Sequence, residues 1–355
     1  MSNGSYGGSC TAVEVHDLSC GSETSSVAHH IVGISHHTGS NQKNTVERNS
    51  VYNLNAISSG ASTVYGIAAG AGTNTLTLKN NMICLGNNMA SGGSITGIYK
   101  NTTGADVIIH NSVYVGGTVS GSTQNTFAFV RDVATDNSVT GNVVSNNIFV
   151  NKRSGGTSGK HYVLSTKLAS DYSLTYPIIC NYNCYDKGNG TNNIFGLVAT
   201  TDYDFASWKT TTKYDANSIS ADPVFADATN VSTPDLSIKR NANIVDAKGN
   251  ATYTAIDDYY GSIRSGLTPC DMGAFAYIYD PKAALVDLNE NRLQLAVSNS
   301  SILVRGYATK TVHIYSVDGK IVKNTVLQSD NEKLSLSRGC YIVRIENQVA
   351  KVIIN

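Results

Sequence analysis

The chain has 355 residues, which is long enough for one extended domain or for two to three smaller ones. Its 26 basic and 26 acidic residues give a formal net charge of zero, and charged residues make up only 15% of the sequence. Binding of nucleic acid through charge requires a clustered basic excess, so this composition excludes that class of partner. No apolar run approaches the roughly 18 residues of a transmembrane helix, and the N-terminal sequence lacks the pattern of a secretory signal peptide.

A repeated unit occupies the first half of the chain. Each unit begins with an apolar strand start, continues with a Thr-, Val- or Ile-rich strand, and ends with an aromatic strand led by asparagine. The first elements begin at Gly33, Gly66, Gly97, Ala128, Tyr162 and Gly196, at intervals of 33, 31, 31, 34 and 34 residues. A near-constant period of this size indicates supersecondary units that stack on one another.

Three short strands in each period leave no room for a helix, so we expect every period to form one coil of a parallel β-solenoid. The second strands are predicted at residues 45–47, 75–78, 106–109, 138–139 and 177–179. The third strands are predicted at residues 49–52, 81–84, 111–114, 146–149 and 182–185. The inward apolar stack is predicted to consist of Ile34, Ile67, Ile98, Phe129, Val163 and Leu197. We expect the asparagine that leads each third strand to adopt a left-handed backbone conformation and to join an internal hydrogen-bonded ladder.

The segments 145–151, 222–225 and 256–277 carry a resemblance to the right-handed parallel β-helix proteins of bacterial surfaces. In that family the closing stretch reads D-x-x-G-x-x-R and then D-x-G-A-x-E. The residues that match are Asp258, Gly261, Arg264, Asp271, Gly273 and Ala274, whereas Ala276 replaces the glutamate. The resemblance covers about residues 27 to 277 and implies a right-handed parallel β-helix over residues 1–279, closed by residues 200–279. It implies no activity, because the family includes lyases, hydrolases, adhesins and proteins without known activity.

The sequence changes character at Asp280-Pro281 and predicts a second domain over residues 280–355. Short strands are predicted at residues 293–297, 301–305, 311–315, 321–322, 333–336, 340–345 and 350–354. Asp318-Gly319 between two of them is a strong hairpin signal. Seven strands in so few residues predict a small Ig-like β-sandwich, so the predicted fold class of the whole chain is all-β.

Three phrases in this second domain resemble the C-terminal sorting domain of type IX secretion cargo in Gram-negative Bacteroidota. They are residues 312–320, 337–344 and 351–354. The resemblance implies the type IX secretion machinery as a partner, and a secreted or outer-membrane location. The alternative is a generic Ig-like binding module. Such cargo normally carries a signal peptide, so we expect a leader or further coils upstream of Met1.

The seven cysteines, at positions 10, 20, 84, 180, 184, 270 and 340, fit no zinc-binding spacing. Cys84 and Cys184 fall on strand positions that elsewhere hold Tyr or Phe, so we expect them to be buried apolar fillers. A disulfide between Cys10 and Cys20 is compatible with an oxidising compartment, but the sequence leaves the pairing open.

One polar patch on the repeat is a candidate ligand-binding site. The third position after each strand start holds His36, Ala69, Lys100, Arg131 and Ser165. Stacking therefore brings Lys100 and Arg131 together, with Tyr99 and Asp132 beside them, in an arrangement that suits an acidic or neutral glycan. The alternative is a set of solvated turn charges. The patch lacks the six to eight oxygen ligands of a calcium site, so we predict no metal and no cofactor.

The sequence gives little evidence that the protein is an enzyme. Lys160-His161 could act in acid–base chemistry, although His161 is expected at a strand start. A metal site that contains His30 and His36 is a minor alternative. Glycoside hydrolysis requires two nearby carboxylates, and the carboxylates on the coils are Glu47, Asp106, Asp132, Asp136, Asp171 and Asp186. Only Asp106 and Asp132 are predicted on neighbouring coils. The sequence therefore favours a non-catalytic stalk, adhesin or glycan-contacting surface protein, with a polysaccharide lyase or glycoside hydrolase as the alternative.

Overall fold

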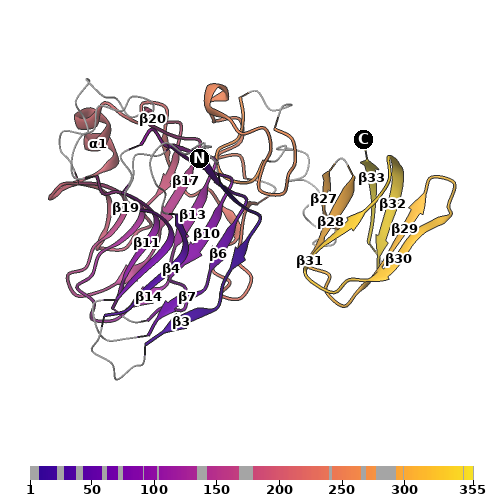
Figure 1. Cartoon of the computed structure of the whole chain (residues 1–355), viewed down its shortest axis with the longest axis horizontal. Helices are drawn as coiled ribbons and strands as arrows, with labels where there is room; N and C mark the ends of the chain where they lie inside the picture. The colour runs from indigo at the N-terminus through magenta and orange to yellow at the C-terminus, as the bar shows by residue number, and fades with distance from the viewer. Residues whose placement is uncertain are drawn as a thin grey trace, which may run out of the picture. The chain divides into compact units, whose positions relative to one another are not determined.

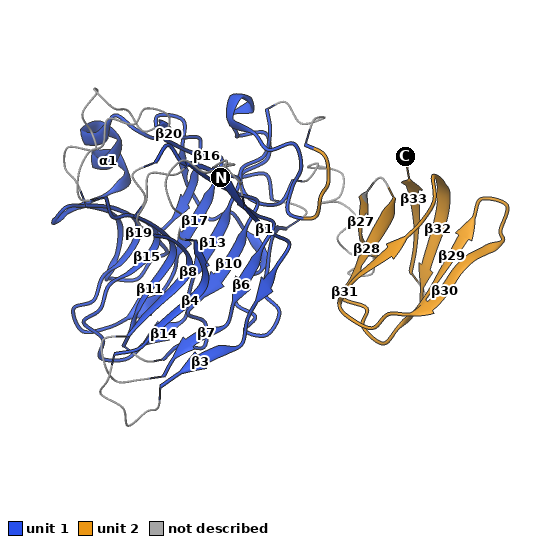
Figure 2. Ribbon diagram, viewed as in Figure 1, with its two compact units in different colours: residues 1–259, 264–279 blue, residues 260–263, 280–355 orange. Residues whose placement is uncertain are grey.

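The computed structural model describes residues 8–21, 28–36, 43–57, 62–70, 75–90, 92–101, 104–133, 142–167, 179–239, 242–264, 269–276, 293–298, 300–346 and 348–354. The chain divides into two compact units (Figure 2). The first comprises residues 1–259 and 264–279, and the second comprises residues 260–263 and 280–355. Helices are rare in the described ranges, where the longest is the eight-residue α1, Phe205–Thr212.

The first unit is a parallel β-solenoid, as the sequence predicts (Figure 1). One sheet contains β1 (Ser9–Thr11), β5 (Lys43–Glu47), β9 (Thr75–Lys79), β12 (Val107–Ile109), β16 (Val143–Ser145) and β20 (Ile179–Asn181). A second contains β2 (Glu14–Val15), β6 (Ser50–Tyr52), β10 (Met82–Leu85), β13 (Ser112–Val115), β17 (Ile148–Asn151), β21 (Cys184–Asp186) and β24 (Ile219–Ser220). The third contains β4 (His30–His36), β8 (Thr63–Ala69), β11 (Ser94–Lys100), β15 (Thr126–Arg131), β19 (His161–Thr166), β22 (Asn193–Val198) and the antiparallel β23 (Thr201–Tyr203).

Smaller strand pairs complete the first unit. They are β3 (Leu18–Cys20) with β7 (Leu54–Ala56), β14 (Thr118–Val119) with β18 (Ser154–Gly155), and β25 (Phe225–Asp227) with β26 (Asp235–Ile238). A short 3-10 helix, η2, spans Ala251–Tyr253. The apolar side chains that point inward from the three large sheets form one continuous core.

The described strands add to the prediction in two places. The predicted strand at 138–139 lies outside the described residues, and the strand that pairs with β12 in this coil is β16, Val143–Ser145. The solenoid also begins earlier than the sequence indicates, because β1 pairs in parallel with β5 and β2 with β6. The polar segment before the first predicted unit therefore contributes a coil of its own.

The inward stack also shifts in its last two positions. Ile34, Ile67, Ile98 and Phe129 follow one another in register, as predicted. The next partners are Leu164 and Gly196 in place of Val163 and Leu197. Val163 is nevertheless buried in the core, as Ala128 is at the same place in the preceding strand, so two consecutive residues of β19 belong to the core.

The predicted asparagine ladder runs through the solenoid. In each step the side-chain amide of one asparagine donates to the side-chain oxygen of the next, over distances of 2.8–3.1 Å. Its members are Asn49, Asn81, Asn111, Asn147 and Asn183. The left-handed backbone predicted for the leading asparagine is found at Asn146, which heads the predicted strand 146–149, although the ladder member in that coil is Asn147. In the other coils it lies one position before the leading asparagine. The residue before each member has a φ between 52° and 59°, and these residues are Arg48, Asn80, His110, Asn146 and Tyr182.

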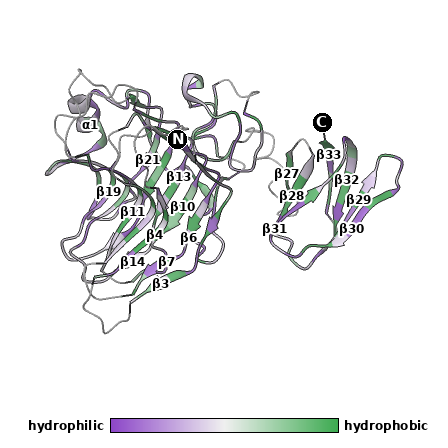
Figure 3. Cartoon of the chain, in the orientation of Figure 1, coloured by the Kyte–Doolittle hydropathy of each residue, from purple (hydrophilic) through white to green (hydrophobic). Residues whose placement is uncertain are grey.

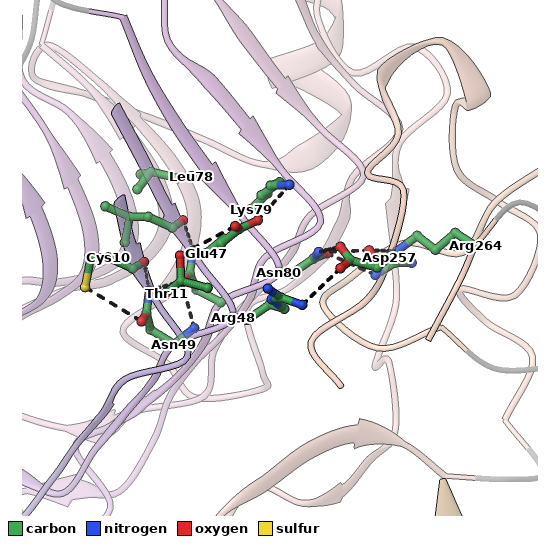
Figure 4. Close-up of polar contacts among 12 residues, drawn as sticks. Cys10, Thr11, Glu47, Arg48, Asn49, Leu78, Lys79, Asn80, Asp257 and Arg264 are labelled. Atoms are coloured by element: carbon green, nitrogen blue, oxygen red, sulfur yellow. Dashed lines mark hydrogen bonds and ion pairs between the residues drawn. The ribbon is translucent and has the colours of Figure 1, made fainter. Parts of the chain in front are cut away.

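Residues 242–259, 264 and 269–276 close the first unit, and several of them bind to these left-handed turns (Figure 4). Arg48 Nη1 lies 3.1 Å from Asp257 Oδ2, and Asn80 Nδ2 donates to the backbone oxygen of Asp257 at 2.8 Å. Arg264, which the family resemblance singles out, donates to the Asp257 backbone oxygen at 2.9 Å and to the Gly273 backbone oxygen at 2.8 Å. The closing motif therefore has a structural role in this chain.

The second unit contains the seven predicted strands within its described residues. One antiparallel sheet contains β27 (Gln294–Ser298), β28 (Ser301–Arg305) and β31 (Asn331–Ser335), in that order. The other contains β30 (Ile321–Val326), β29 (Thr311–Ser316), β32 (Gly339–Ile345) and β33 (Gln348–Ile354). Hydrophobic and hydrophilic residues alternate along these strands (Figure 3). The inward residues of both sheets form one separate core, which makes the unit a small β-sandwich.

Candidate functional site

The predicted ligand-binding residues lie at the ends of two neighbouring strands of the third sheet. Lys100 ends β11 and Arg131 ends β15, and the two residues are directly paired in register. Tyr99 precedes Lys100, and Asp132 follows Arg131. Because successive side chains of a strand point to opposite faces, the four residues divide into an inward and an outward pair.

Lys100 and Arg131 form the inward pair and are both buried. Lys100 Nζ lies 2.9 Å from Asp106 Oδ2, and only 2% of Lys100 is exposed. Asp106 also accepts the backbone N–H of Leu76 at 2.9 Å. A buried ion pair of this kind requires satisfied partners because of the large cost of desolvating each charge. The buried ion pair between Lys100 and Asp106 therefore stabilises the turn that connects β11 to β12.

Tyr99 and Asp132 form the outward pair. The Tyr99 hydroxyl donates to Asp132 Oδ2 at 2.6 Å, and Lys167 Nζ lies 2.8 Å from Asp132 Oδ1. Partial burial, followed by the hydrogen bond to Asp132, raises the pKa of Tyr99. The phenol therefore stays protonated and remains a donor at neutral pH, while the carboxylate keeps acceptor sites for a further ligand.

Other aromatic side chains surround this outward pair on the same face of the sheet. The Tyr65 ring lies 5.0 Å from the Tyr99 ring, and the Phe127 ring stacks on Tyr162 at 5.4 Å. Tyr65, Tyr99 and Phe127 are partly exposed on three successive strands, whereas Tyr162 is buried. We call the outward side chains Tyr65, Tyr99, Phe127, Asp132 and Lys167 the tyrosine face.

The sequence reading missed Tyr65, Phe127 and Lys167 as members of this face. Tyr65 and Phe127 belong to one row of the third sheet, because each pairs with Thr96 between them. The sequence did contain a signal for these two members of the face, because Tyr65 and Phe127 are aromatic residues two periods apart at the same outward strand position. That signal can be read only when the outward positions are known. Two consecutive buried residues within a strand, such as Val163 and Leu164, break the alternation that would reveal these positions.

The remaining catalytic candidates are held in structural contacts. His161 starts β19, as expected, and its ring contacts Thr126 Oγ1 at 2.9 Å. Burial lowers its pKa. His30 and His36 lie at opposite ends of the seven-residue β4, about 20 Å apart, so they cannot share a metal ion. Within the described ranges no group of three or more His, Cys, Asp or Glu residues could hold a metal.

The carboxylates considered for glycoside hydrolysis pair with lysines wherever the structure describes them. Glu47 pairs with Lys79 at 2.7 Å, and Asp186 pairs with Lys152 at 2.9 Å. Asp106 and Asp132 pair with lysines as given above. Asp136 and Asp171 lie outside the described residues. Each described carboxylate thus has a cationic partner, which is unlike the two opposed carboxyl groups of a glycosidase.

A shallow depression lies away from the tyrosine face, beside the second sheet. Its lining residues are Tyr52, Asn53, Cys84, Gly86, Asn87, Asn88, Asn230, Val231 and Pro234. Their polar side-chain groups are amides, the Tyr52 phenol and the Cys84 thiol, and burial raises the pKa of the phenol and of the thiol. The seven cysteines are free thiols, including Cys10 and Cys20, and Cys84 and Cys184 are buried as expected. In the described part of the chain, no helix is long and apolar enough to cross a membrane.

Comparison with known proteins adds one finding. Residues 284–354 match a family described as a domain of unknown function (DUF6383). This match covers the strands of the second unit and carries no functional assignment. No curated protein and no solved structure gives a significant match to the chain.

Proposed function

We propose that this protein is a non-catalytic β-helix displayed outside the cell, which contacts glycans through the tyrosine face. The proposal includes a secreted or outer-membrane location in a Gram-negative bacterium. The second unit then serves as the signal that the type IX secretion machinery recognises. Support for that role comes from the three phrases in the sequence, two of which form β29 and β32, the inner strands of the four-stranded sheet.

The observation that carries glycan contact is the aromatic surface beside a hydrogen-bonded carboxylate. A sugar ring packs its C–H faces against aromatic rings, and its hydroxyls exchange hydrogen bonds with carboxylates and phenols. Tyr65, Tyr99 and Phe127 present partly exposed rings on neighbouring strands about 4.8 Å apart. Asp132 supplies a fixed acceptor at the edge of these rings. Lys100 and Arg131 support the face from behind, because their side chains are buried.

The ion-paired carboxylates argue against the alternative of a lyase or hydrolase. Glycoside hydrolysis requires two opposed carboxyl groups that flank the scissile bond. Asp132 instead accepts a phenolic hydrogen bond from Tyr99 and pairs with Lys167, so neither of these partners is a second carboxyl group. The face is therefore suited to binding a polysaccharide and not to cleaving it.

Binding to an array of immobilised polygalacturonate, alginate and mannan tests this proposal. We expect the full chain to bind at least one of these polymers, and Tyr99→Ala to weaken that binding about tenfold through loss of ring stacking and of the phenol. Tyr52→Ala is the matched control. Its hydroxyl also donates to a carboxylate, that of Glu14 at 2.8 Å, but it lies on β6 in a different sheet. Equal losses in both variants, or cleavage of a polymer that Asp132→Asn abolishes, would overturn the proposal.

A further inference from the structure

The third sheet carries a second polar cluster of the kind that Asp132 forms with its two partners. The Tyr162 hydroxyl donates to Asp202 Oδ1 at 2.8 Å, and Lys160 pairs with the other oxygen of the same carboxylate. In both clusters a tyrosine and a lysine bind the two oxygens of one aspartate. We call these groups the Asp132 cluster and the Asp202 cluster. The same chemical arrangement therefore occurs twice on one sheet.

Both clusters present their charged groups to solvent on the outward side of the sheet. Tyr162 is itself buried, so it positions the Asp202 carboxylate without forming surface. The Asp202 and Lys160 side chains are 33% and 44% exposed. The corresponding values for Asp132 and Lys167 are 28% and 55%. A ligand can thus reach one aspartate and one lysine in each cluster.

The tyrosines of the two clusters lie on strands that are separated by one other strand. Tyr99 belongs to β11 and Tyr162 to β19, and β15 lies between these strands (Figure 2). Tyr99 is in register with Val130 and, through it, with Ser165. Ser165 comes three residues after Tyr162, which places the Cα atoms of the two tyrosines about 14 Å apart. Val130 and Phe127 on β15 are partly exposed, so an apolar path runs between the clusters.

Each cluster has no net charge, because one carboxylate is paired with one ammonium group. A uronic acid polymer carries a carboxylate on every sugar, and a protein binds such groups through cations that are available to pair with them. On this face that carboxylate would meet Asp132 or Asp202, which repel it. The hydroxyls of a neutral sugar instead donate to these aspartates, whose oxygens accept more than one hydrogen bond each, and accept from the lysines. The charge pattern therefore favours an uncharged sugar.

We propose that the tyrosine face and the Asp202 cluster together bind an extended neutral polysaccharide that runs diagonally across β11, β15 and β19. This inference rests on the proposed glycan contact and narrows it to polymers without charged groups. The distance between the clusters exceeds one sugar ring, so several linked sugars bridge them. The C–H faces of the middle sugars pack over Phe127 and Val130. Because one polymer chain engages both clusters, long oligosaccharides bind more tightly than short ones.

A panel of soluble polymers tests the substrate class with the full chain. Mannan, xylan and xyloglucan are the neutral members, and polygalacturonate and alginate are the acidic ones. We expect at least one neutral polymer to bind, to remain bound in about 1 M salt, where attraction between exposed charges is screened, and to bind at least tenfold more tightly than either acidic polymer. Equal or preferred binding of an acidic polymer would overturn this inference and leave the proposed glycan contact standing. Absence of binding to every polymer would overturn both.

The double variant Asp132→Asn/Asp202→Asn tests the role of charge balance. Asparagine keeps the shape and one oxygen acceptor for each tyrosine, but both lysines lose their ionic partners and the face becomes positive. We expect the neutral polymer to bind about tenfold more weakly, because amides accept weaker hydrogen bonds than carboxylates, and polygalacturonate to bind at low salt. Asp186→Asn/Asp222→Asn is the matched control, because both carboxylates pair with Lys152 on β17, at 2.9 and 2.6 Å. An equal gain of polygalacturonate binding in the control, or unchanged binding of the neutral polymer in the test variant, would contradict the proposal.

Oligosaccharides of defined length test whether one chain engages both clusters. A disaccharide cut from the bound polymer reaches one cluster, whereas a hexasaccharide reaches both. By calorimetry we expect the hexasaccharide to bind the wild type at least tenfold more tightly than the disaccharide. The single variant Asp202→Asn should reduce this ratio to a few-fold. A ratio that Asp202→Asn leaves unchanged would show that the tyrosine face binds alone, and the two-cluster arrangement would be wrong.

Discussion

Single polar residues inside the solenoid use nearly all of their hydrogen-bonding capacity. Asn147 donates to the backbone oxygens of Ile108 and Ser145 and to Asn183 Oδ1, at 2.9–3.1 Å. Its own side-chain oxygen accepts two donors from Asn111. A buried amide left unsatisfied would cost about 1–3 kcal/mol, so each member depends on its neighbours. The ladder therefore fixes the register between coils as well as adding stability.

Two buried histidines make the stability of the first unit depend on pH. Burial lowers the pKa of His110 well below its usual 6.5, and it also lowers the pKa of His161. Both are neutral in the folded protein, while in the unfolded chain they take up protons as the pH falls through about 6.5. The contribution of the two histidines to the free energy of unfolding is therefore fully present above that pH. It is lost as the pH falls from 6.5 towards their lowered pKa values in the folded protein.

We expect the free energy of unfolding to fall between pH 7 and pH 5, by up to about 1.4 kcal/mol per pH unit for each histidine. Denaturant titrations followed by the fluorescence of Trp208, the single tryptophan, measure this change. His161→Gln should reduce the slope with pH by the share of one group, and its stability at pH 8 reports the cost of the substitution itself. An unchanged slope in His161→Gln would contradict the assignment.

At the scale of elements, α1 covers the last coil of the solenoid. Asp204 caps its N-terminus by accepting the backbone N–H of Ser207 at 2.7 Å. Trp208 is buried on the inner side of the helix and lies against Phe195, with ring centroids 5.6 Å apart. Its indole N–H donates to Asp215 at 3.0 Å. Asp215 also accepts the amide of Asn183 and so terminates the asparagine ladder.

Close packing of Trp208 requires glycine at position 196. A Cβ atom there would lie 2.6 Å from the indole ring, so Gly196→Ala forces the helix away from β22. We expect this substitution to lower the free energy of unfolding by about 1–3 kcal/mol. In Gly92→Ala the new Cβ meets its nearest neighbours at 3.4 Å, an ordinary contact, which makes it a suitable control. Equal stability of the two variants in denaturant titrations would show that α1 does not pack as described.

At the scale of the whole molecule, the two units have separate hydrophobic cores. Trp208 belongs to the first core, and Ile314 belongs to the second, where it is fully buried. Separate cores predict separate unfolding transitions. We expect Ile314→Ala to destabilise the second unit by about 2–5 kcal/mol through the cavity it leaves.

Circular dichroism and Trp208 fluorescence distinguish the two transitions. In Ile314→Ala, the fluorescence midpoint in denaturant should remain at its wild-type value, because Trp208 reports on the first unit alone. The circular dichroism signal should lose part of its amplitude at lower denaturant. A fluorescence midpoint that shifts together with the circular dichroism would show that the units unfold as one.

Much of the fold follows from the sequence alone, because its signals are local and repeated. The strand starts from Gly33 to Gly196 recur once per coil, and parallel stacking is the arrangement in which such strands share one core. The ladder asparagines follow from the same period. The seven short strands of the second unit are equally readable, since alternation of apolar and polar residues is a property of each strand by itself.

Tertiary structure decided what depends on distant partners. The strand that pairs with β12 begins at Val143, and the fifth inward residue is Leu164. Both were out of reach of the sequence, because only pairing with the preceding coil defines the register. The same pairing determines that the Lys100 side chain points inward and the Tyr99 side chain points outward. Lys100 is therefore buried, whereas Tyr99 belongs to the tyrosine face. Asp257 reaches Asn80 across 177 residues. Contacts at such separation depend on the assembled surface of the coils, which no local pattern encodes.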